Sequence, residues 1–395
     1  MKLINRTSYM DTLTSLIGVP DIKVITGIRR SGKSKLLEAL RDYVEANLSN
    51  SNVIHINYNL DEFENLLEYH ALLAYVKEHR VSGKQNFLLI DEVQMCDGFE
   101  RAINSLHASE QYDIFITGSN SFLLSSDLST LFTFEIEVFP FSFEEYRLYG
   151  DEGEVDRDFD EYARTGGMSG SYPYPLQEQR YQYLSNVFKT LIVRDIVQRH
   201  NVRNESALLR IADYMMDNVS NITSARNITD ILNADGLKIT NKTVGTYMGC
   251  LCDAFAFYKV RRYDIRGKKY LKSGEKYYLA DHAFKYALLG TRDMDWGRVY
   301  ENMVAIELLR RGYEVYVGVL YKKEIDFVAI KRSEKLYIQV SDDISSDKTF
   351  EREISPLLSI GDAYPKMILA RTHHEATDRN GVQIVDLARW LCDEA

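Results

Sequence analysis

The chain has 395 residues, which is more than one ordinary hydrophobic core accommodates, so two or three domains are expected. Hydrophobic residues make up 45% and charged residues 27% of the chain, a balance that excludes disordered and fibrous proteins. The formal net charge of −10 excludes a protein that coats nucleic acid with its whole surface.

A membrane helix needs roughly twenty consecutive apolar residues, and no stretch of the chain approaches that length. The first six residues lead into a polar segment and lack the apolar run of a signal peptide. Cys250 and Cys252 lie two positions apart on a predicted helix, so their thiols point apart and no metal pair is expected. We therefore expect a cytoplasmic protein with reduced thiols and no membrane partner.

The first half of the chain alternates short apolar runs with segments of helical periodicity. Strands that are almost entirely apolar and separated by helices are typical of a parallel sheet covered on both faces. The predicted strands are 22–26, 53–58, 87–90, 112–117 and 134–138. The predicted helices are 34–46 and 62–80. An acidic stretch at 149–160 breaks this α/β pattern, and we place the first domain boundary there.

Residues 27–34 read Gly-Ile-Arg-Arg-Ser-Gly-Lys-Ser and match G-x-x-x-x-G-K-[ST] between a predicted strand and a predicted helix. The glycines let the backbone curl so that successive N–H groups face phosphates, and the helix N-terminus adds its dipole. Lys33 is expected to reach the β- and γ-phosphates of ATP, and the Ser34 hydroxyl to bind Mg²⁺. The residues expected around the nucleotide are Gly27, Arg30, Ser31, Gly32, Lys33, Ser34 and Lys35.

A second motif follows the apolar run 87–90. Asp91 ends that strand, where its carboxylate can hold Mg²⁺ together with Ser34. Glu92 is in position to polarise the attacking water, which favours a class that hydrolyses its nucleotide. The motif therefore predicts an ATPase.

Polar residues also follow the strand 112–117. Thr117 and Asn120 are candidates to contact the γ-phosphate or the attacking water, although ordinary turn residues explain them equally well. The predicted catalytic residues are Lys33, Asp91, Glu92, Thr117 and Asn120.

The middle of the chain is predicted to be helical and then to form a hairpin. The predicted helices are 177–200, 206–218, 225–233 and 241–255, and the strands that follow are 256–263 and 276–279. Helix–turn–helix followed by a β-hairpin is the layout of a winged helix.

The hairpin carries a concentration of positive charge that is unusual in an acidic chain. Its basic residues are Lys259, Arg261, Arg262, Arg266, Lys268, Lys269, Lys272 and Lys276. Such a wing would bind the phosphates of double-stranded DNA without sequence preference. Docking of a protein partner, or a solvated charge run, explains the same residues equally well.

The helix that runs from Asn241 to Phe255 is the candidate recognition helix. Its apolar stripe leaves Asn241, Lys242 and Thr246 facing outward near the N-terminus, where such helices meet base edges or phosphates. We therefore treat this helix as the second half of a DNA-binding surface.

Four segments, 25–34, 90–94, 116–121 and 139–146, together resemble the AAA+ ATPases of bacteria and archaea. The chain is similar to the group with a C-terminal domain of unassigned function, and the similarity continues through 277–281 and 301–304. The resemblance implies an AAA+ ATPase domain over 1–155, a helical and winged-helix domain over 156–292, and a degenerate PD-(D/E)XK nuclease-like α/β domain over 293–395.

The chain departs from that group's pattern at Thr130-Leu131, where similar proteins carry Gly-Arg. If the missing arginine normally reaches the γ-phosphate of a neighbouring subunit, its loss weakens the case for finger-driven hydrolysis in a homo-oligomer. Arg147 and Arg194 are the candidate substitutes.

The last part of the chain is predicted to form a small α/β domain. Its predicted helices are 297–311, 349–360 and a terminal helix, and its predicted strands are 315–319, 324–330, 335–340, 366–370 and 382–385. A metal nuclease of the implied fold would use carboxylates such as Glu301, Glu324 and Asp326.

Such a nuclease completes its site with Glu-x-Lys on the next strand, where this chain has Gln339 and Ser341. The ligand carboxylate and the lysine are both absent, so we expect a domain that does not cleave DNA. A lysine supplied from elsewhere, with Lys322 or Lys323 as candidates, would reverse that expectation.

Three functions follow from these motifs. The leading hypothesis is a Mg²⁺-dependent ATPase that couples nucleotide binding and hydrolysis to a DNA or protein partner. The second is a switch that alternates between ATP and ADP states with little turnover, which the missing arginine favours. The third is an ATP-regulated DNA endonuclease.

Overall fold

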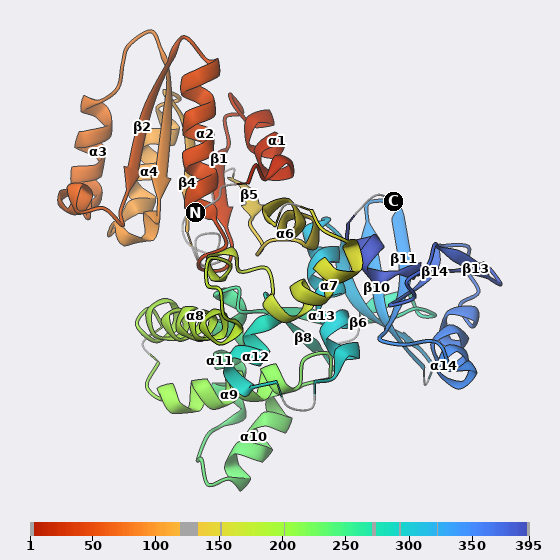
Figure 1. Ribbon diagram of the computed structural model, residues 1–395. Helices are drawn as coiled ribbons and strands as arrows, with labels where there is room; N and C mark the ends of the chain where they lie inside the picture. The colour runs from red at the N-terminus through yellow and green to blue at the C-terminus, as the bar shows by residue number, and fades with distance from the viewer. Residues whose placement is uncertain are drawn as a thin grey trace. The chain divides into compact units, whose positions relative to one another are not determined.

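The computed structural model describes residues 4–118, 133–150, 152–200, 202–270, 274–291, 294–321 and 323–392 (Figure 1). The chain forms two compact units. The N-terminal unit comprises Leu3–Val138 with Asp253–Phe255, and the C-terminal unit contains the remainder.

The N-terminal unit is built on a parallel five-stranded sheet, so the predicted P-loop α/β fold is confirmed. The strand order is β2-β3-β4-β1-β5, and each neighbouring pair is parallel. The strands are β1 (Ile22–Thr26), β2 (Ser51–Asn57), β3 (Gln85–Asp91), β4 (Tyr112–Thr117) and β5 (Thr133–Glu137). Every residue of β1 is buried, including Lys23, as expected for a central strand of a sheet covered on both faces.

Helices cover both faces of this sheet (Figure 1). Alternate residues of β3 point to opposite faces: Phe87 and Leu89 join the core formed with α1 and α2, whereas Leu88 and Ile90 join the core formed with α3 and α4. The helices are α1 (Thr7–Ser15), α2 (Lys33–Asn47), α3 (Tyr69–Glu78) and α4 (Phe99–Ala108).

The single helix predicted over 62–80 is wrong. A short 3₁₀ helix, η1 (Asp61–Leu66), precedes α3, and Glu68 between them is extended, with φ −118° and ψ 143°. Here Leu67 accepts a hydrogen bond from the Asp97 N–H, and the Tyr69 N–H donates to the Asp97 carbonyl. Because a distant segment uses these backbone groups, the helix cannot run through Leu67 and Glu68.

The C-terminal unit begins with helices. They are α6 (Phe143–Tyr149), α7 (Val155–Thr165), α8 (Gln177–Thr190), the π-helical η5 (Leu191–Val197), α9 (Glu205–Asp217), α10 (Ala225–Ala234), α11 (Asn241–Asp253), α12 (Ala283–Leu289) and α13 (Trp296–Arg310). The helices predicted at 206–218, 225–233 and 241–255 correspond to α9, α10 and α11, whereas α6, α7 and α12 were not predicted.

A mixed sheet forms the rest of this unit, with the order β13-β14-β12-β11-β10-β9-β6-β7 and β8 paired to β6. Its strands are β6 (Phe257–Asp264), β7 (Lys269–Tyr270), β8 (Lys276–Leu279), β9 (Glu314–Leu320), β10 (Lys323–Lys331), β11 (Glu334–Ser341), β12 (Lys366–Ala370), β13 (Thr377–Arg379) and β14 (Val382–Asp386). Helices α14 (Asp347–Leu358) and α15 (Leu387–Leu391) complete the unit.

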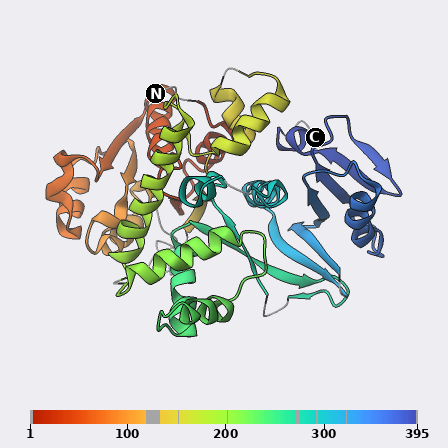
Figure 2. The same ribbon diagram turned by 60° about the horizontal axis from the view of Figure 1, so that its bottom comes forward.

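The predicted hairpin strands 256–263 and 276–279 are β6 and β8, which pair antiparallel. Strand β6 also pairs parallel with β9, so one sheet joins strands from both sides of residue 292 (Figure 2). The division into three domains at residues 155 and 292 stays a prediction.

Candidate nucleotide-binding site

The loop between β1 and α2 adopts a backbone that only small residues allow. Gly27 has φ 128° and Gly32 has φ 103°. A Cβ atom at Gly27 would lie 2.3 Å from the carbonyl oxygen of Val138. The loop can therefore approach the end of β5 only because residue 27 has no side chain.

Lys33, the first residue of α2, is buried and points back into the loop. Its Nζ donates hydrogen bonds to the carbonyl oxygens of Gly27 at 2.8 Å and Ile28 at 3.0 Å. The ammonium is thus held on the inner side of the loop. Because the N-terminal end of α2 also attracts negative charge, the two together favour a bound anion such as a phosphate.

Asp91 ends β3 with a buried carboxylate whose two oxygens differ. Its Oδ1 accepts a hydrogen bond of 2.5 Å from the Thr117 hydroxyl, whereas its Oδ2 is buried without a hydrogen-bond partner among the described residues. Burial raises the pKa of Asp91, and the hydroxyl groups of Thr117 and the nearby Ser34 oppose that rise. A buried oxygen without a partner is costly in a protein interior unless a ligand satisfies it.

Thr117 connects the two acidic residues. Besides donating to Asp91, its hydroxyl oxygen accepts a hydrogen bond of 3.0 Å from the backbone N–H of Glu92. Glu92 has a left-handed backbone, with φ 58° and ψ 47°, and its carboxylate accepts a hydrogen bond from the Gln94 amide. Non-glycine residues in this conformation cluster at functional sites.

The structure therefore brings together most of the residues that the motifs predicted. Ser31 is buried and its hydroxyl has no hydrogen-bond partner among the described residues. Arg30, with φ 69°, and Lys35 are exposed, and Lys35 forms an ion pair with Glu38 at 2.5 Å. Asn120 lies outside the described residues, as does the Thr130-Leu131 pair.

One residue of this site carries no sequence signal. Arg6, just before α1, is 5% exposed, and its guanidinium donates a hydrogen bond of 3.0 Å to the carbonyl oxygen of Ser31. The guanidinium also lies 4.4 Å from the ring centroid of Tyr9. Because 25 residues separate Arg6 from Ser31, only the folded chain places a second cation behind the phosphate loop.

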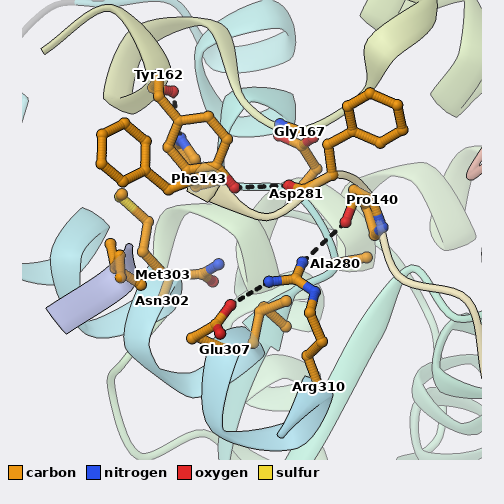
Figure 3. Close-up of a pocket in the computed structure, with 14 residues that line it drawn as sticks. Pro140, Phe143, Tyr162, Gly167, Ala280, Asp281, Asn302, Met303, Glu307 and Arg310 are labelled. Atoms are coloured by element: carbon orange, nitrogen blue, oxygen red, sulfur yellow. Dashed lines mark hydrogen bonds and ion pairs between the residues drawn. The ribbon is translucent and has the colours of Figure 1, made fainter. Parts of the chain in front are cut away.

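Three segments of the C-terminal unit that carry the AAA+ resemblance surround one cavity of about 20 Å³, which holds about one water molecule. In Figure 3, Arg310 lies between Glu307 and the Pro140 carbonyl, to which its guanidinium donates at 2.8 Å. Asp281 accepts from the Gly167 and Ala283 N–H groups at 2.7 and 2.9 Å. These segments pack the unit together and leave no room for a nucleotide.

The carboxylates predicted for a nuclease-like site also meet in the C-terminal unit. They surround Lys276, which the sequence places in the basic wing. The Nζ of Lys276 lies 2.9 Å from Glu301, 2.9 Å from Glu324 and 4.0 Å from Asp326. Burial and the neighbouring Glu301 raise the pKa of Asp326 to about 8.

Of the two predicted substitutes for the lysine, Lys323 is engaged outside this cluster. Lys323 donates to the hydroxyls of Ser355 at 2.7 Å and Ser359 at 3.0 Å, and Lys322 lies outside the described residues.

The assignment of Lys276 to a DNA-binding wing is wrong, because the side chain is 3% exposed and ion-paired. Lys259 pairs with Glu275 at 2.7 Å, and Arg266 lies over the ring of Tyr321. Lys268 is exposed. The exposed positive charge of the hairpin is therefore smaller than the sequence indicated.

Comparison with known proteins gives the class. Residues 19–147 match the family described as "AAA domain", which together with the P-loop sheet defines a nucleotide-binding AAA+ ATPase. Residues 156–295 match a domain of unknown function, DUF8612. In the described part of the chain, no helix combines the length and apolar character needed to cross a membrane.

Two relatives resemble most of the chain. An uncharacterized protein of Haemophilus influenzae is 34% identical over 98% of each chain, and this protein belongs to the same family. An uncharacterized protein of Methanocaldococcus jannaschii is 26% identical over 84% of this chain and 77% of its own.

Two solved structures show a low similarity to parts of the chain. The Aeropyrum pernix ORC1 protein in complex with DNA is 12% identical, with a TM-score of 0.30, over 78% of this chain and 94% of its own. AMPPCP-bound DnaA from Aquifex aeolicus is 16% identical, with a TM-score of 0.32, over 62% of this chain and 87% of its own.

We expect Gly27→Ala to lower the free energy of unfolding by at least about 3 kcal/mol, because the added methyl group collides with the Val138 carbonyl. Gly18 is the matched control: it also has a positive φ, 79°, but no atom lies within 4 Å of the Cβ position. Gly18→Ala should cost only the left-handed backbone strain of about 1–2 kcal/mol. Urea denaturation measures both values; equal losses would contradict the close approach at Gly27.

We expect Arg6→Met to weaken ATP binding roughly tenfold, because a hydrogen bond from a charged group is worth about 1.5–3 kcal/mol. Arg6→Lys should retain part of the affinity. Arg41→Met, which removes a partly exposed arginine from the middle of α2, should retain all of it. Fluorescent-nucleotide titration measures the three dissociation constants. Wild-type affinity in Arg6→Met would show that Arg6 only packs against α1.

Proposed function

We propose that this protein hydrolyses ATP with Mg²⁺ at the site formed by the P-loop, Asp91, Glu92 and Thr117. The observation that carries the proposal is the buried Oδ2 of Asp91 beside Ser34, an oxygen for which the described part of the chain offers no hydrogen-bond donor. A carboxylate oxygen and a serine hydroxyl are the ligands that P-loop ATPases use for Mg²⁺. The residues present therefore fit the ion.

Each residue then has a separate task. The P-loop N–H groups and Lys33 would bind the phosphates and offset their charge. Asp91 and Ser34 would hold Mg²⁺. The ion would withdraw negative charge from the β- and γ-phosphates. Glu92 would orient and polarise the attacking water. Thr117 supports both acidic residues at once, through Oδ1 of Asp91 and the N–H of Glu92. Thr117 therefore fixes the position of the metal ligand, Asp91, relative to the water-polarising group, Glu92.

The test uses two substitutions with different expected results. Lys33→Ala should lower ATP affinity roughly a hundredfold, because it removes the phosphate-binding ammonium. Glu92→Gln should bind ATP with unchanged affinity and slow its turnover by about 10²–10⁴-fold, because only polarisation of water is lost. Nucleotide titration and phosphate release measure the two effects. Unchanged ATP affinity in Lys33→Ala would remove the P-loop assignment.

A second candidate, a nucleotide switch with little turnover, has one observation in its favour. Arg147, a proposed substitute for the missing arginine, is held by Asp158 at 3.2 Å and by the Gly153 carbonyl at 3.1 Å. An arginine engaged in this way is poorly placed to reach a phosphate on another subunit. Turnover at saturating ATP, with and without DNA, separates the switch from the ATPase.

We further propose that DNA is the partner of the C-terminal unit, through the wing and α11. Asn241, Lys242 and Thr246 are exposed. A groove of about 410 Å³ adjoins the N-terminal end of α11 and is lined by residues that include Arg203 and Lys238. Cations beside a helix N-terminus favour a phosphate-containing partner over an acidic protein surface.

Duplex DNA should bind weakly, with an affinity that falls steeply as salt rises. Reversing the charge of Lys268, Lys269 and Lys272 to Glu should remove most of the binding, because phosphate attraction becomes repulsion. The matched control reverses three exposed lysines outside the hairpin, Lys77, Lys84 and Lys348. Fluorescence anisotropy over a salt series measures binding; equal affinity of the two triple variants would assign the hairpin to protein docking.

A further inference from the structure

The carboxylate cluster of the C-terminal unit already contains a cation. Lys276 belongs to β8, whereas Glu301 lies on α13 and Glu324 and Asp326 lie on β10. The ammonium is in hydrogen-bond contact with Glu301 and approaches Glu324 as closely, at 2.9 Å each. Three segments far apart in the sequence thus direct their charged groups at one point.

Lys276 is positively charged at neutral pH. Burial alone would lower the pKa of Lys276, but the carboxylates of Glu301, Asp326 and Glu324 together raise it. The ammonium therefore keeps its proton at neutral pH. Separating a buried ammonium from its carboxylate partners costs free energy, so the side chain of Lys276 stays in the cluster.

Asp326 and Gln339 form further hydrogen bonds beside the cluster. Oδ2 of Asp326 accepts the Val340 N–H at 2.9 Å, and the Asp326 N–H donates to Oε1 of Gln339 at 2.8 Å. The Gln339 amide nitrogen donates to Glu353 at 2.9 Å. Gln339 is thus oriented by two hydrogen bonds and supports Asp326.

These groups do not fit the divalent metal that a nuclease-like fold implies. A metal ion bound by Glu301 and Glu324 at roughly 2.0–2.6 Å would lie close to the ammonium, which is 2.9 Å from an oxygen of each carboxylate. Two cations at that separation repel strongly in a buried site. Among the described residues, no three His, Cys, Asp or Glu side chains are arranged to hold a metal ion.

We propose that Lys276 is a built-in cation that replaces the metal, so that this cluster binds no Mg²⁺ or Mn²⁺ and instead locks β8 to α13 and β10. Neighbouring contacts serve the same purpose. The Tyr278 hydroxyl donates to Glu301 at 2.7 Å. Asn302 exchanges two hydrogen bonds with the backbone of Leu279, at 2.7 and 2.9 Å, as a neighbouring strand would.

The test measures Mn²⁺ binding to nucleotide-free protein by electron paramagnetic resonance, in an Asp91→Asn background that removes the acidic ligand of the ATP site. The parent protein should leave the signal of free Mn²⁺ unchanged. Lys276→Met should bind Mn²⁺ stoichiometrically, because three carboxylates then lack a cation. Adding Asp326→Asn to Lys276→Met should abolish that binding.

The matched control is Lys259→Met, which removes a lysine paired with one carboxylate, that of Glu275 just before β8, and should bind no Mn²⁺. A folded Lys276→Met that binds no Mn²⁺ would overturn the proposal.

The parent protein tests the proposal even if Lys276→Met does not fold. Mn²⁺ binding to the parent that disappears with Asp326→Asn would overturn it. Incubation with supercoiled DNA and Mn²⁺ gives a second readout: nicking that disappears with Asp326→Asn would make Lys276 the lysine of a working nuclease.

Discussion

The candidate nucleotide-binding site of the N-terminal unit depends on a buried ammonium at the start of α2 and a buried carboxylate at the end of β3. Lys33 follows β1 and Asp91 ends β3, and the positive charge of Lys33 acts against the rise in the pKa of Asp91 that burial causes. Neither group faces water, so each depends on the other and on the backbone around it. The loop curvature at Gly27 and the bond from Thr117 both serve to hold these two charges in place.

The C-terminal unit solves a similar electrostatic problem differently. Its acidic side chains, Glu301, Glu324 and Asp326, surround Lys276 of the same chain, whose ammonium offsets part of their negative charge. At the ATP site, an acidic oxygen of Asp91 has no partner among the described residues and is suited to a ligand. The two acidic sites therefore differ in the property that decides ligand binding: one has a free oxygen and the other contains its own cation.

A second buried ion pair illustrates how charge also fixes strand register. Lys23 of β1 is fully buried and lies 2.6 Å from Asp113 of β4. Asp113 also accepts the Gly18 N–H at 2.7 Å, which ties the turn before β1 to the sheet. A one-residue slip of β1 against β4 would point Lys23 to the other face and leave Asp113 unpaired, so the pair selects one register.

The amino-acid sequence by itself determined the phosphate loop, the strand that ends at Asp91 and most of the helices, because those signals are local. Eight consecutive residues specify the loop, and apolar runs of fully buried strands need no knowledge of their neighbours. The break in the helix predicted over 62–80 depended on backbone hydrogen bonds to Asp97, about thirty residues away, which no local pattern encodes. Only the tertiary structure placed Arg6 behind the loop and moved Lys276 from a solvated wing into a carboxylate cluster. Such assignments depend on which distant groups share a low-dielectric interior, and a charge run read along the chain does not reveal which of its members is buried.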